Sequence, residues 1–338
     1  MDKNFTSYRV DDRSYVAFVK REIHNELLHS HFGKSRIAET DIVIAELTSN
    51  LIKHAGGGEL LSRITDIGKD ASILELVTID NGPGIGDISK MMKDGVSTTN
   101  TLGQGLGAIK RLSNLFQIFS LPKWGTVSYS LLRSAAEPST SQGFDAKALI
   151  VPKPGESVSG DGVQVLKTKE EVRIFFGDGL GHGEHAHEAV TQATEFFQNC
   201  TETDPVEIIR AMHDAVRKTR GLVAAIAILD IVKRKWRFCG VGNIVTRLHG
   251  GITFKHYLSY NGIVGLNIPK SLNVSEMPAE RNQLLIMSSD GLKTGWDFNK
   301  YPNISKSDPM LLASALYKDF SRRNDDATIF IGKQFFAS

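Results

Sequence analysis

The sequence is poor in cysteine, with only Cys200 and Cys239 among 338 residues. Two cysteines give neither a disulfide framework nor a metal-ligand spacing, which fits a reducing cytosol. Long apolar runs are also missing, because the longest, residues 223–229, is far too short to span a bilayer. The formal net charge of +2 shows no basic excess of the kind that nucleic-acid binding requires. Composition therefore predicts a cytoplasmic protein with no membrane segment and no nucleic-acid partner.

A chain of this length favours two domains. Residues 134–146 are small and polar and lack apolar periodicity, as a linker does. Strand-like runs at residues 126–132 and 148–151 flank this segment. We therefore expect a first domain at residues 1–133, a linker at 134–146 and a second domain at 147–338.

Apolar periodicity predicts a mixed α/β fold in both domains. In residues 35–54, Ile37, Ile44, Leu47 and Leu51 fall on one face of a helix. Further helices are expected at residues 106–115, 185–197, 205–218 and 310–320, and strands at 73–79, 126–132, 148–151, 171–176, 222–230, 235–240 and 283–287.

On the first of these helices, Glu46 and Asn50 are one turn apart and share a face that is not the apolar one. A carboxylate can act as a general base toward a water or a hydroxyl. An amide oxygen is a hard ligand of the kind that suits Mg²⁺. The alternative for the pair alone is a solvated polar face.

Asp80 ends an expected strand and is followed by Gly82 and Gly84. Its carboxylate can accept a hydrogen bond from an exocyclic amine such as that of adenine. Glycines let the backbone approach a flat ring closely. An ordinary tight turn is the alternative, since Asn-Gly is a common turn dipeptide.

A second glycine-rich run, Gly103, Gly105 and Gly107 with Leu106 between them, opens the expected helix at 106–115. Backbone N–H groups at such a helix start can cradle phosphates. The run is neither a Walker A loop nor a convincing dinucleotide motif. The polar residues 87–102 before it are expected to form a lid over a nucleotide.

The second half contains aspartates at or beside strand ends: Asp161, Asp178, Asp290 and the pair Asp325–Asp326. Carboxylates at strand ends can converge on one rim of a sheet, where they suit Mg²⁺ or Mn²⁺. Two such ions can activate a bridging water and clamp a phosphoryl oxygen. Each Asp-Gly pair alone is more typical of a hairpin turn.

The histidines offer alternative chemistry. His182, His185 and His187 are candidate zinc ligands, but residues 185 and 187 do not share a helix face. A solvated or capping role is favoured for them. His24 and His54 in the first half are not on a convincing phosphoacceptor helix, so histidine autophosphorylation is not expected.

The nucleotide motifs, in this order and spacing, resemble the GHKL ATPases, whose fold is the Bergerat α/β sandwich. The match is closest to the serine/threonine kinases of bacterial partner switching, some of which are anti-sigma factors, over most of residues 10–133. The resemblance implies Mg²⁺ on Asn50, Glu46 as the base and adenine on Asp80. It further implies a nucleotide-binding set of Gly82, Gly84, Gly103, Gly105, Leu106, Gly107 and Thr126.

The aspartate motifs resemble the SpoIIE-type branch of the PPM serine/threonine phosphatases over about residues 147–334. That resemblance implies an α/β/β/α sandwich holding two Mn²⁺ or Mg²⁺ ions. It implies Asp178, the carbonyl of Gly179 and Asp290 as the main ligands, with Asp161 and Asp325 completing the set. The family pattern favours Asp325 over Asp326.

Together the resemblances imply a bifunctional switch protein that both adds phosphate to a serine or threonine and removes it. The implied partner is a STAS-domain antagonist protein; a sigma factor is a second candidate, and a homodimer is compatible with the sequence. In the alternative hypothesis, the ATP domain is a non-catalytic module that binds a partner or senses ATP for the phosphatase.

Overall fold

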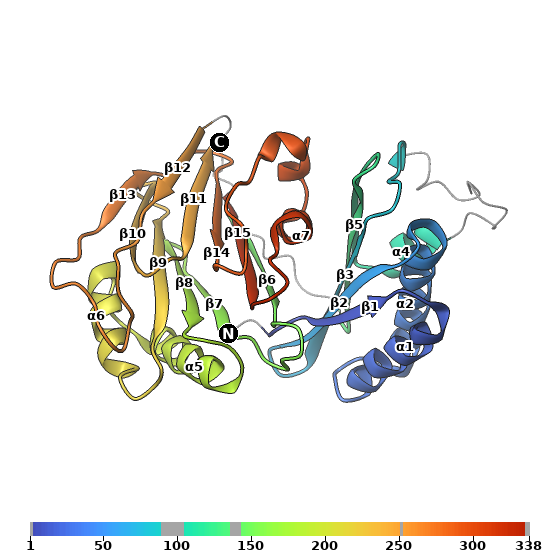
Figure 1. Cartoon of the computed structure of the whole chain (residues 1–338), viewed down its shortest axis with the longest axis horizontal. Coiled ribbons are helices and arrows are strands. Elements are labelled where there is room, and N and C mark those ends of the chain that lie inside the picture. The colour runs from blue at the N-terminus through green and yellow to red at the C-terminus, as the bar shows by residue number, and fades with distance from the viewer. Residues whose placement is uncertain (1–2, 89–104, 136–142, 251–252, 335–338) are drawn as a thin grey trace. The chain divides into compact units, whose positions relative to one another are not determined.

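The computed structural model describes residues 3–88, 105–135, 143–250 and 253–334, and it divides the chain into two compact units (Figure 1). The N-terminal unit comprises Phe5–Ser139 together with Tyr301–Ala315. The C-terminal unit comprises Met1–Asn4, Thr140–Lys300 and Leu316–Ser338. A short stretch from late in the sequence therefore belongs to the N-terminal unit.

The N-terminal unit is built on a five-stranded antiparallel sheet in the order β1-β2-β3-β5-β4. The strands are β1 (Thr6–Val10), β2 (Gly58–Ile67), β3 (Ala71–Asp80), β4 (Leu115–Leu121) and β5 (Gly125–Arg133). Side chains alternate between the two faces of such a sheet, so each strand contributes to two different surroundings.

Three helices lie along one face of this sheet (Figure 1): α1 (Arg13–Leu28), α2 (Lys34–Ala55) and α4 (Gly105–Leu112). The expected apolar face of α2 is confirmed, since Ile37, Ile44, Leu47 and Leu51 are all buried in the core beneath the helices. The helix ends where Gly56 adopts a left-handed φ of 71°, a conformation that glycine takes without strain.

The opposite face of the sheet holds a buried ion pair between Arg63 on β2 and Glu75 on β3. The guanidinium donates to Glu75 Oε2 from Nη2 at 2.6 Å and from Nε at 2.8 Å. Tyr129 donates its hydroxyl to Glu75 Oε1 at 2.7 Å, and the guanidinium stacks over the Phe5 ring at 4.2 Å. Arg63 and Glu75 are 5% and 2% exposed, so the pair is buried and each charge stabilises the other.

The late segment Tyr301–Ala315 packs within the same unit. Tyr301 is buried and its ring meets Phe119 and Trp124 edge-on, with centroids 6.2 and 6.1 Å apart. The backbone N–H of Asp308 donates to Gln117 Oε1 at 2.8 Å. The β4–β5 hairpin, which carries Phe119 and Trp124, is thereby held by residues from the second half of the sequence.

The C-terminal unit consists of two five-stranded sheets in the orders β13-β10-β9-β8-β7 and β12-β11-β14-β15-β6. Their facing residues form one apolar core that includes Phe144, Phe176, Trp236 and Phe330. The strands are β6 (Phe144–Val151), β7 (Asp161–Lys167), β8 (Glu171–Gly179), β9 (Leu222–Asp230), β10 (Lys235–Val241), β11 (Val245–Gly250), β12 (Thr253–Tyr257), β13 (Ser275–Pro278), β14 (Leu284–Ser288) and β15 (Ala327–Gln334).

Helices α5 (Glu184–Asn199) and α6 (Pro205–Ala215) cover the first of these sheets, where Phe175 and Phe197 share a second apolar core. Between β14 and β15 the chain forms two short 3₁₀ turns, η1 (Phe298–Lys300) and η2 (Ile304–Lys306), and then helix α7 (Pro309–Phe320). The expected mixed α/β fold is confirmed. Strand β6 begins inside the segment expected as a linker.

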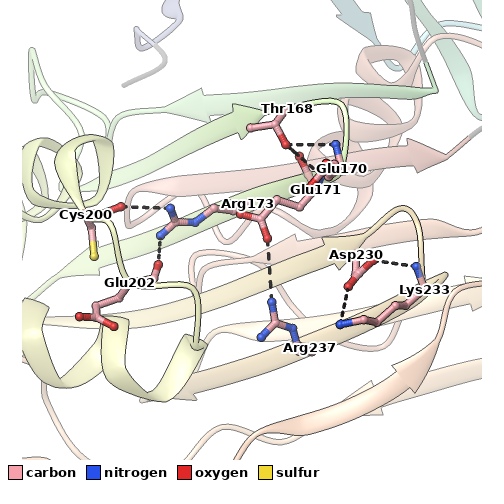
Figure 2. A network of polar contacts seen from close by, with 9 residues as sticks. All are labelled: Thr168, Glu170, Glu171, Arg173, Cys200, Glu202, Asp230, Lys233 and Arg237. Atoms are coloured by element: carbon pink, nitrogen blue, oxygen red, sulfur yellow. Dashed lines mark hydrogen bonds and ion pairs between the residues drawn. The ribbon is translucent and has the colours of Figure 1, made fainter.

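Arg173 on β8 fixes the far end of α5 (Figure 2). It donates from Nη1 to the carbonyl of Cys200 at 3.0 Å and from Nη2 to that of Glu202 at 2.6 Å. A cation near the end of a helix satisfies carbonyls that have no partner inside the helix. On the same strand, Glu171 Oε2 lies 3.9 Å from Arg237 Nη2. A row of polar contacts therefore holds this end of the sheet.

No helix within the described ranges is long and apolar enough to cross a bilayer.

The buried ion pair predicts a large effect on stability. Glu75→Gln removes the carboxylate that pairs with buried Arg63 and is expected to cost about 3–5 kcal/mol of local unfolding free energy. Hydrogen exchange of the β2 and β3 amides measures this cost. The double variant Arg63→Met/Glu75→Leu is expected to lose much less; if it loses as much as the single variant, the ion pair is not the cause.

Candidate functional site

The N-terminal unit brings three of the nucleotide-motif residues together at the start of α4. Glu46 and Asn50 project from α2 and are half-buried. A Cβ placed on Gly105 would lie 2.7 Å from Glu46 Oε2 and 3.9 Å from Asn50 Oδ1. The glycine therefore lets the N-terminal turn of α4 approach the carboxylate and the amide.

Asp80, at the end of β3, is fixed by the turn that follows it. Its Oδ1 accepts from the backbone N–H of Gly82 at 2.8 Å and from that of Thr126 at 3.1 Å. Thr126 is also paired with Asp80 in the β3–β5 ladder. The carboxylate is thus oriented by backbone groups, and Asp80, Gly82 and Thr126 are neighbours as expected.

The β4–β5 hairpin supports this turn closely. Gly84 has a φ of 77°, and a side chain there would clash with the carbonyl of Leu121. Ser120 accepts from the backbone N–H of Ile85 at 2.8 Å, and Lys123 N–H donates to the Pro83 carbonyl at 2.8 Å. The turn is therefore locked to the same hairpin that contacts Tyr301.

Two parts of the expected nucleotide site lie outside the described residues: Gly103 and almost all of the expected lid at 87–102. Leu106 and Gly107 lie in the first turn of α4, where Gly107 is buried.

In the C-terminal unit, two of the expected metal ligands are direct neighbours. Asp161 at the start of β7 is paired in register with Asp178 near the end of β8. The backbone N–H of Gly179 donates to the carbonyl of Gly160 at 2.9 Å, which ties the two strand ends together. Asp161 is 1% exposed, and its Oδ2 has no hydrogen-bond partner within the described part of the chain.

The second sheet supplies Asp290, after β14, and the Asp325–Asp326 pair, before β15. Asp326 is buried and accepts from the backbone N–H of Lys153 at 2.8 Å and of Gly160 at 2.9 Å. Both of its carboxylate oxygens are thus engaged by the backbone. Asp325 is partly exposed, and its Oδ1 accepts from the backbone N–H of Asp326 at 3.0 Å.

The crowding of these carboxylates is visible in their pKa values. Burial, together with the charge of Asp326, raises the pKa of Asp161 to about 8. Burial and the charges of Asp161 and Asp290 raise the pKa of Asp178 well above its usual value. Each shift reflects the cost of an ionised carboxylate that lacks a nearby cation. An unpaired buried oxygen and a set of hard carboxylates fit a divalent cation.

The carboxylates do not yet converge on one point. Across residues 3–88, 105–135, 143–250 and 253–334, no three His, Cys, Asp or Glu side chains form a cluster ready to hold a metal ion. Asp290 Oδ2 instead accepts from the Asn243 amide at 2.9 Å. Metal binding at this end of the unit therefore requires some of the carboxylate side chains to turn toward one another.

The histidines considered as zinc ligands are directed elsewhere. His182 Nδ1 lies 2.7 Å from Glu156 Oε1, whereas His187 Nδ1 donates to the carbonyl of Ser159 at 2.9 Å. His185 lies in the first turn of α5 and is exposed. The exposure of His185 agrees with the solvated role favoured for it, whereas His182 and His187 are engaged by Glu156 and Ser159.

Sequence reasoning assigned no role to Asn243, which positions Asp290. It also missed Ser159, whose hydroxyl accepts from the N–H of Asp161 at 3.0 Å. Short polar residues just before or across from a functional aspartate give a weak signal, because serine and asparagine are equally common in ordinary turns.

Comparison with known proteins gives matches for both halves of the chain. The family model "Stage II sporulation protein E (SpoIIE)" matches residues 168–333. The serine/threonine-protein kinase RsbT of Bacillus subtilis is 40% identical over 96 residues, covering 28% of this chain and 71% of RsbT, and its likeness is to the N-terminal region. The phosphoserine phosphatase RsbX of the same bacterium is 25% identical over 182 residues, covering 54% of this chain and 90% of RsbX.

Two solved structures resemble the chain in fold. One, from the work "The bacterial stressosome: a modular system that has been adapted to control secondary messenger signaling", has a TM-score of 0.53 and 26% identity, and the match covers 56% of this chain and 100% of that one. The other, RsbX in complex with magnesium, has a TM-score of 0.51 and 22% identity over 59% of this chain and 98% of that one. The fold of the matched region is therefore PP2C-like.

The raised pKa of Asp161 predicts pH-dependent stability of the metal-free protein. The carboxyl titrates near 3.8 when unfolded and near 8 when folded, so between these values the folded state holds the extra proton. The free energy of unfolding of the C-terminal unit is therefore expected to fall as the pH rises from about 4 to 8. Urea unfolding at several pH values measures the slope.

Asp161→Asn is the matched variant, because it keeps the shape of the side chain and removes its ionisation. It is expected to reduce the slope, leaving the part due to Asp178, and Mg²⁺ or Mn²⁺ added to the unchanged protein is also expected to reduce it. A slope that is unchanged in Asp161→Asn would show that another group is responsible.

Proposed function

Because the chain joins an N-terminal region of the RsbT kinase family to a serine/threonine phosphatase domain of the SpoIIE family, PP2C type, we propose that it controls one phosphorylation switch from both sides. The phosphatase domain would remove phosphate from a phosphoserine or phosphothreonine. The N-terminal domain would transfer phosphate from ATP to the same class of residue. The proposed boundaries are 1–133 and 147–338, with a linker at 134–146.

The observation that carries the phosphatase proposal is the pairing of Asp161 with Asp178 at the end of two neighbouring strands, both with raised pKa values. Placing the buried Asp161 beside the half-buried Asp178 is costly unless a cation offsets their charges. Divalent ions there would remove the repulsion. A PP2C-type relative, RsbX, has been solved with magnesium.

We assign two Mn²⁺ or Mg²⁺ ions to Asp178, the carbonyl of Gly179, Asp290, Asp161 and Asp325. Asp325 is preferred over Asp326, because backbone N–H groups already engage both oxygens of Asp326. When bound, two such ions supply an activated water for attack on phosphorus. The chain's own part is to hold the aspartates: Asn243 orients Asp290.

The kinase proposal is supported by the arrangement around α4. Glu46 would take the proton of an attacking serine or threonine hydroxyl. Asn50, one turn later, would hold Mg²⁺ with its amide oxygen. Asp80 would accept from the adenine amine while Thr126 and Gly82 hold its other contacts. The N–H groups of Gly105, Leu106 and Gly107 face the phosphates in this assignment, together with Gly103 and Gly84.

The proposed partner is a STAS-domain protein of a partner-switching system, with a sigma factor as a second candidate. The likeness to RsbT and to a chain from a stressosome study supports this class of partner. Phosphate would be added to the partner by one domain and removed by the other. The phosphorylated fraction of the partner would then depend on the relative rates of the two domains.

A second function for the N-terminal unit is favoured by one observation. Residues Tyr301–Ala315 belong to that unit, yet in the sequence they lie between Asp290 and Asp325 of the proposed metal site. The hairpin that contacts Tyr301 also locks the turn after Asp80. ATP binding at Asp80 could therefore act as a signal to the phosphatase rather than as a phosphate source.

Asp290→Asn tests the phosphatase assignment. Loss of one carboxylate ligand is expected to lower Mn²⁺-dependent hydrolysis of a phosphoserine peptide by on the order of 100-fold or more. Asp297→Asn is the control, because it makes the same charge change on an exposed residue of the following loop. Equal activity in the two variants would remove Asp290 from the metal site.

Glu46→Ala tests the kinase assignment and separates it from the ATP-sensing alternative. ATP binding, measured by calorimetry, is expected to be retained, while phosphate transfer to a STAS protein falls by about 10²- to 10⁴-fold. Glu39→Ala on the same helix is the control, with a side chain that is 41% exposed.

Intact-mass measurement of the STAS protein reads the transfer directly. Transfer that continues unchanged in Glu46→Ala contradicts this residue as the base. If the unchanged protein binds ATP tightly, transfers none to any partner and changes its phosphatase rate, the sensing function replaces the kinase function.

A further inference from the structure

The sheet end that carries the paired aspartates also carries an arginine, Arg220, immediately before β9. In the β8–β9 ladder, Gly179 lies opposite Leu222. One step further, the backbone N–H of Leu180 donates to the carbonyl of Gly221 at 3.1 Å. The antiparallel register therefore continues past the strand ends and places Arg220 beside the loop that follows Asp178.

The guanidinium of Arg220 lies over a glycine of that loop. A Cβ on Gly181 would be 3.3 Å from Arg220 Nη1, and Gly181 has a φ of 87°. On its other side, the carbonyl of Gly181 is 3.6 Å from a Cβ placed on Gly160, which would also lie 3.1 Å from Asp326 Oδ2. The backbone at Gly181 thus lies beside Arg220 and also near Gly160, the residue before Asp161.

The cations around the cluster differ in how they are engaged. Arg322 donates from Nε to the carbonyl of Asp290 at 2.9 Å, and His182 lies against Glu156 at 2.7 Å. Arg220 is exposed, and among the described residues its guanidinium makes no hydrogen bond or ion pair. Its neighbour Arg217, by contrast, is paired with Asp214 at 2.9 Å. Arg220 therefore has all of its N–H donors available for a ligand.

We propose that Arg220 binds the phosphoryl oxygens of the phosphoserine or phosphothreonine substrate at the phosphatase site, an inference that rests on the phosphatase function proposed above. A phosphomonoester carries close to two negative charges and must approach a rim lined with carboxylates. A guanidinium at that rim offers two parallel N–H groups, which match two phosphoryl oxygens. The aspartates hold the metal ions, and Arg220 gives the substrate a cationic contact from the protein itself.

Two glycines allow Arg220 to take this position: Gly221, which follows it in the sequence, and Gly181, in the neighbouring loop. Gly221 has a φ of 81°, and a side chain there would meet the carbonyl of Val264 at 2.8 Å. The backbone can therefore turn sharply just after Arg220 and enter β9 directly. Gly181 leaves the space in which the guanidinium lies. An alanine at either position would displace the arginine without changing its charge.

The test compares Arg220→Gln, Arg220→Lys and Arg217→Gln in the full chain loaded with Mn²⁺. For hydrolysis of a phosphoserine peptide, Arg220→Gln is expected to raise KM by about tenfold to hundredfold with a smaller change in kcat. Calorimetry with inorganic phosphate should show a matching loss of affinity, while Mn²⁺ affinity is unchanged. Arg220→Lys should recover part of the loss, because it restores the charge without the two parallel donors. Arg217→Gln should behave like the unchanged protein.

Two results would overturn the proposal: unchanged KM and phosphate affinity in Arg220→Gln, or a fall in kcat alone. An equal loss in Arg217→Gln would also overturn it, because it would reflect general surface charge. Failure of the phosphatase function is seen separately, as absence of hydrolysis by the unchanged protein. In that case the calorimetric ratio between the unchanged protein and Arg220→Gln still decides whether Arg220 binds phosphate.

Discussion

Repulsion between buried carboxylates is the constraint on which the C-terminal unit depends. The register of β7 and β8 puts Asp161 directly opposite Asp178, and the second sheet adds Asp326, whose charge also acts on both. Such a cluster persists only if it is held in place and its charge can be offset. Backbone N–H groups hold Asp326 on both of its oxygens. What remains is negative charge at the end of the sheet, and this charge makes divalent cations the natural ligand.

The N-terminal unit depends instead on close approaches of backbone at glycines. At Gly84 and Gly105 a side chain would collide with the Leu121 carbonyl or the Glu46 carboxylate. The carboxylate of Asp80, in turn, is oriented by two backbone N–H groups. The site is therefore a set of precise backbone positions around a few polar side chains. This arrangement suits recognition of a flat base and a chain of phosphates.

Most elements of the fold could be predicted from periodicity, whereas contacts between distant residues could not. The buried face of α2 and the strand at 222–230 follow from spacing alone, because their apolar patterns are long and regular. Several elements were missed because their residues carry no clean apolar alternation: helix α1 and strands β1, β2, β4, β7, β11, β12 and β13. The sequence predicted that Asp161 and Asp178 lie on one rim of a sheet, but it did not predict that they are direct neighbours in the ladder. Asn243 and Arg220 were given no role from the sequence, because their contacts join segments that are far apart along the chain.

The grouping of Tyr301–Ala315 with the N-terminal unit bears on how the two proposed activities are related. If the halves were independent enzymes on one chain, each would be expected to complete its own core. Instead, Tyr301 completes an aromatic cluster with Phe119 and Trp124, at the hairpin that also locks the turn after Asp80. The same segment continues in sequence into α7 and then to Asp325. Under the proposed ATP-sensing function, a change in the hairpin would act on the stretch of chain that leads to Asp325, one of the proposed metal ligands. Covalent continuity through residues 301–325 is thus a physical link between the proposed nucleotide site and the proposed metal site.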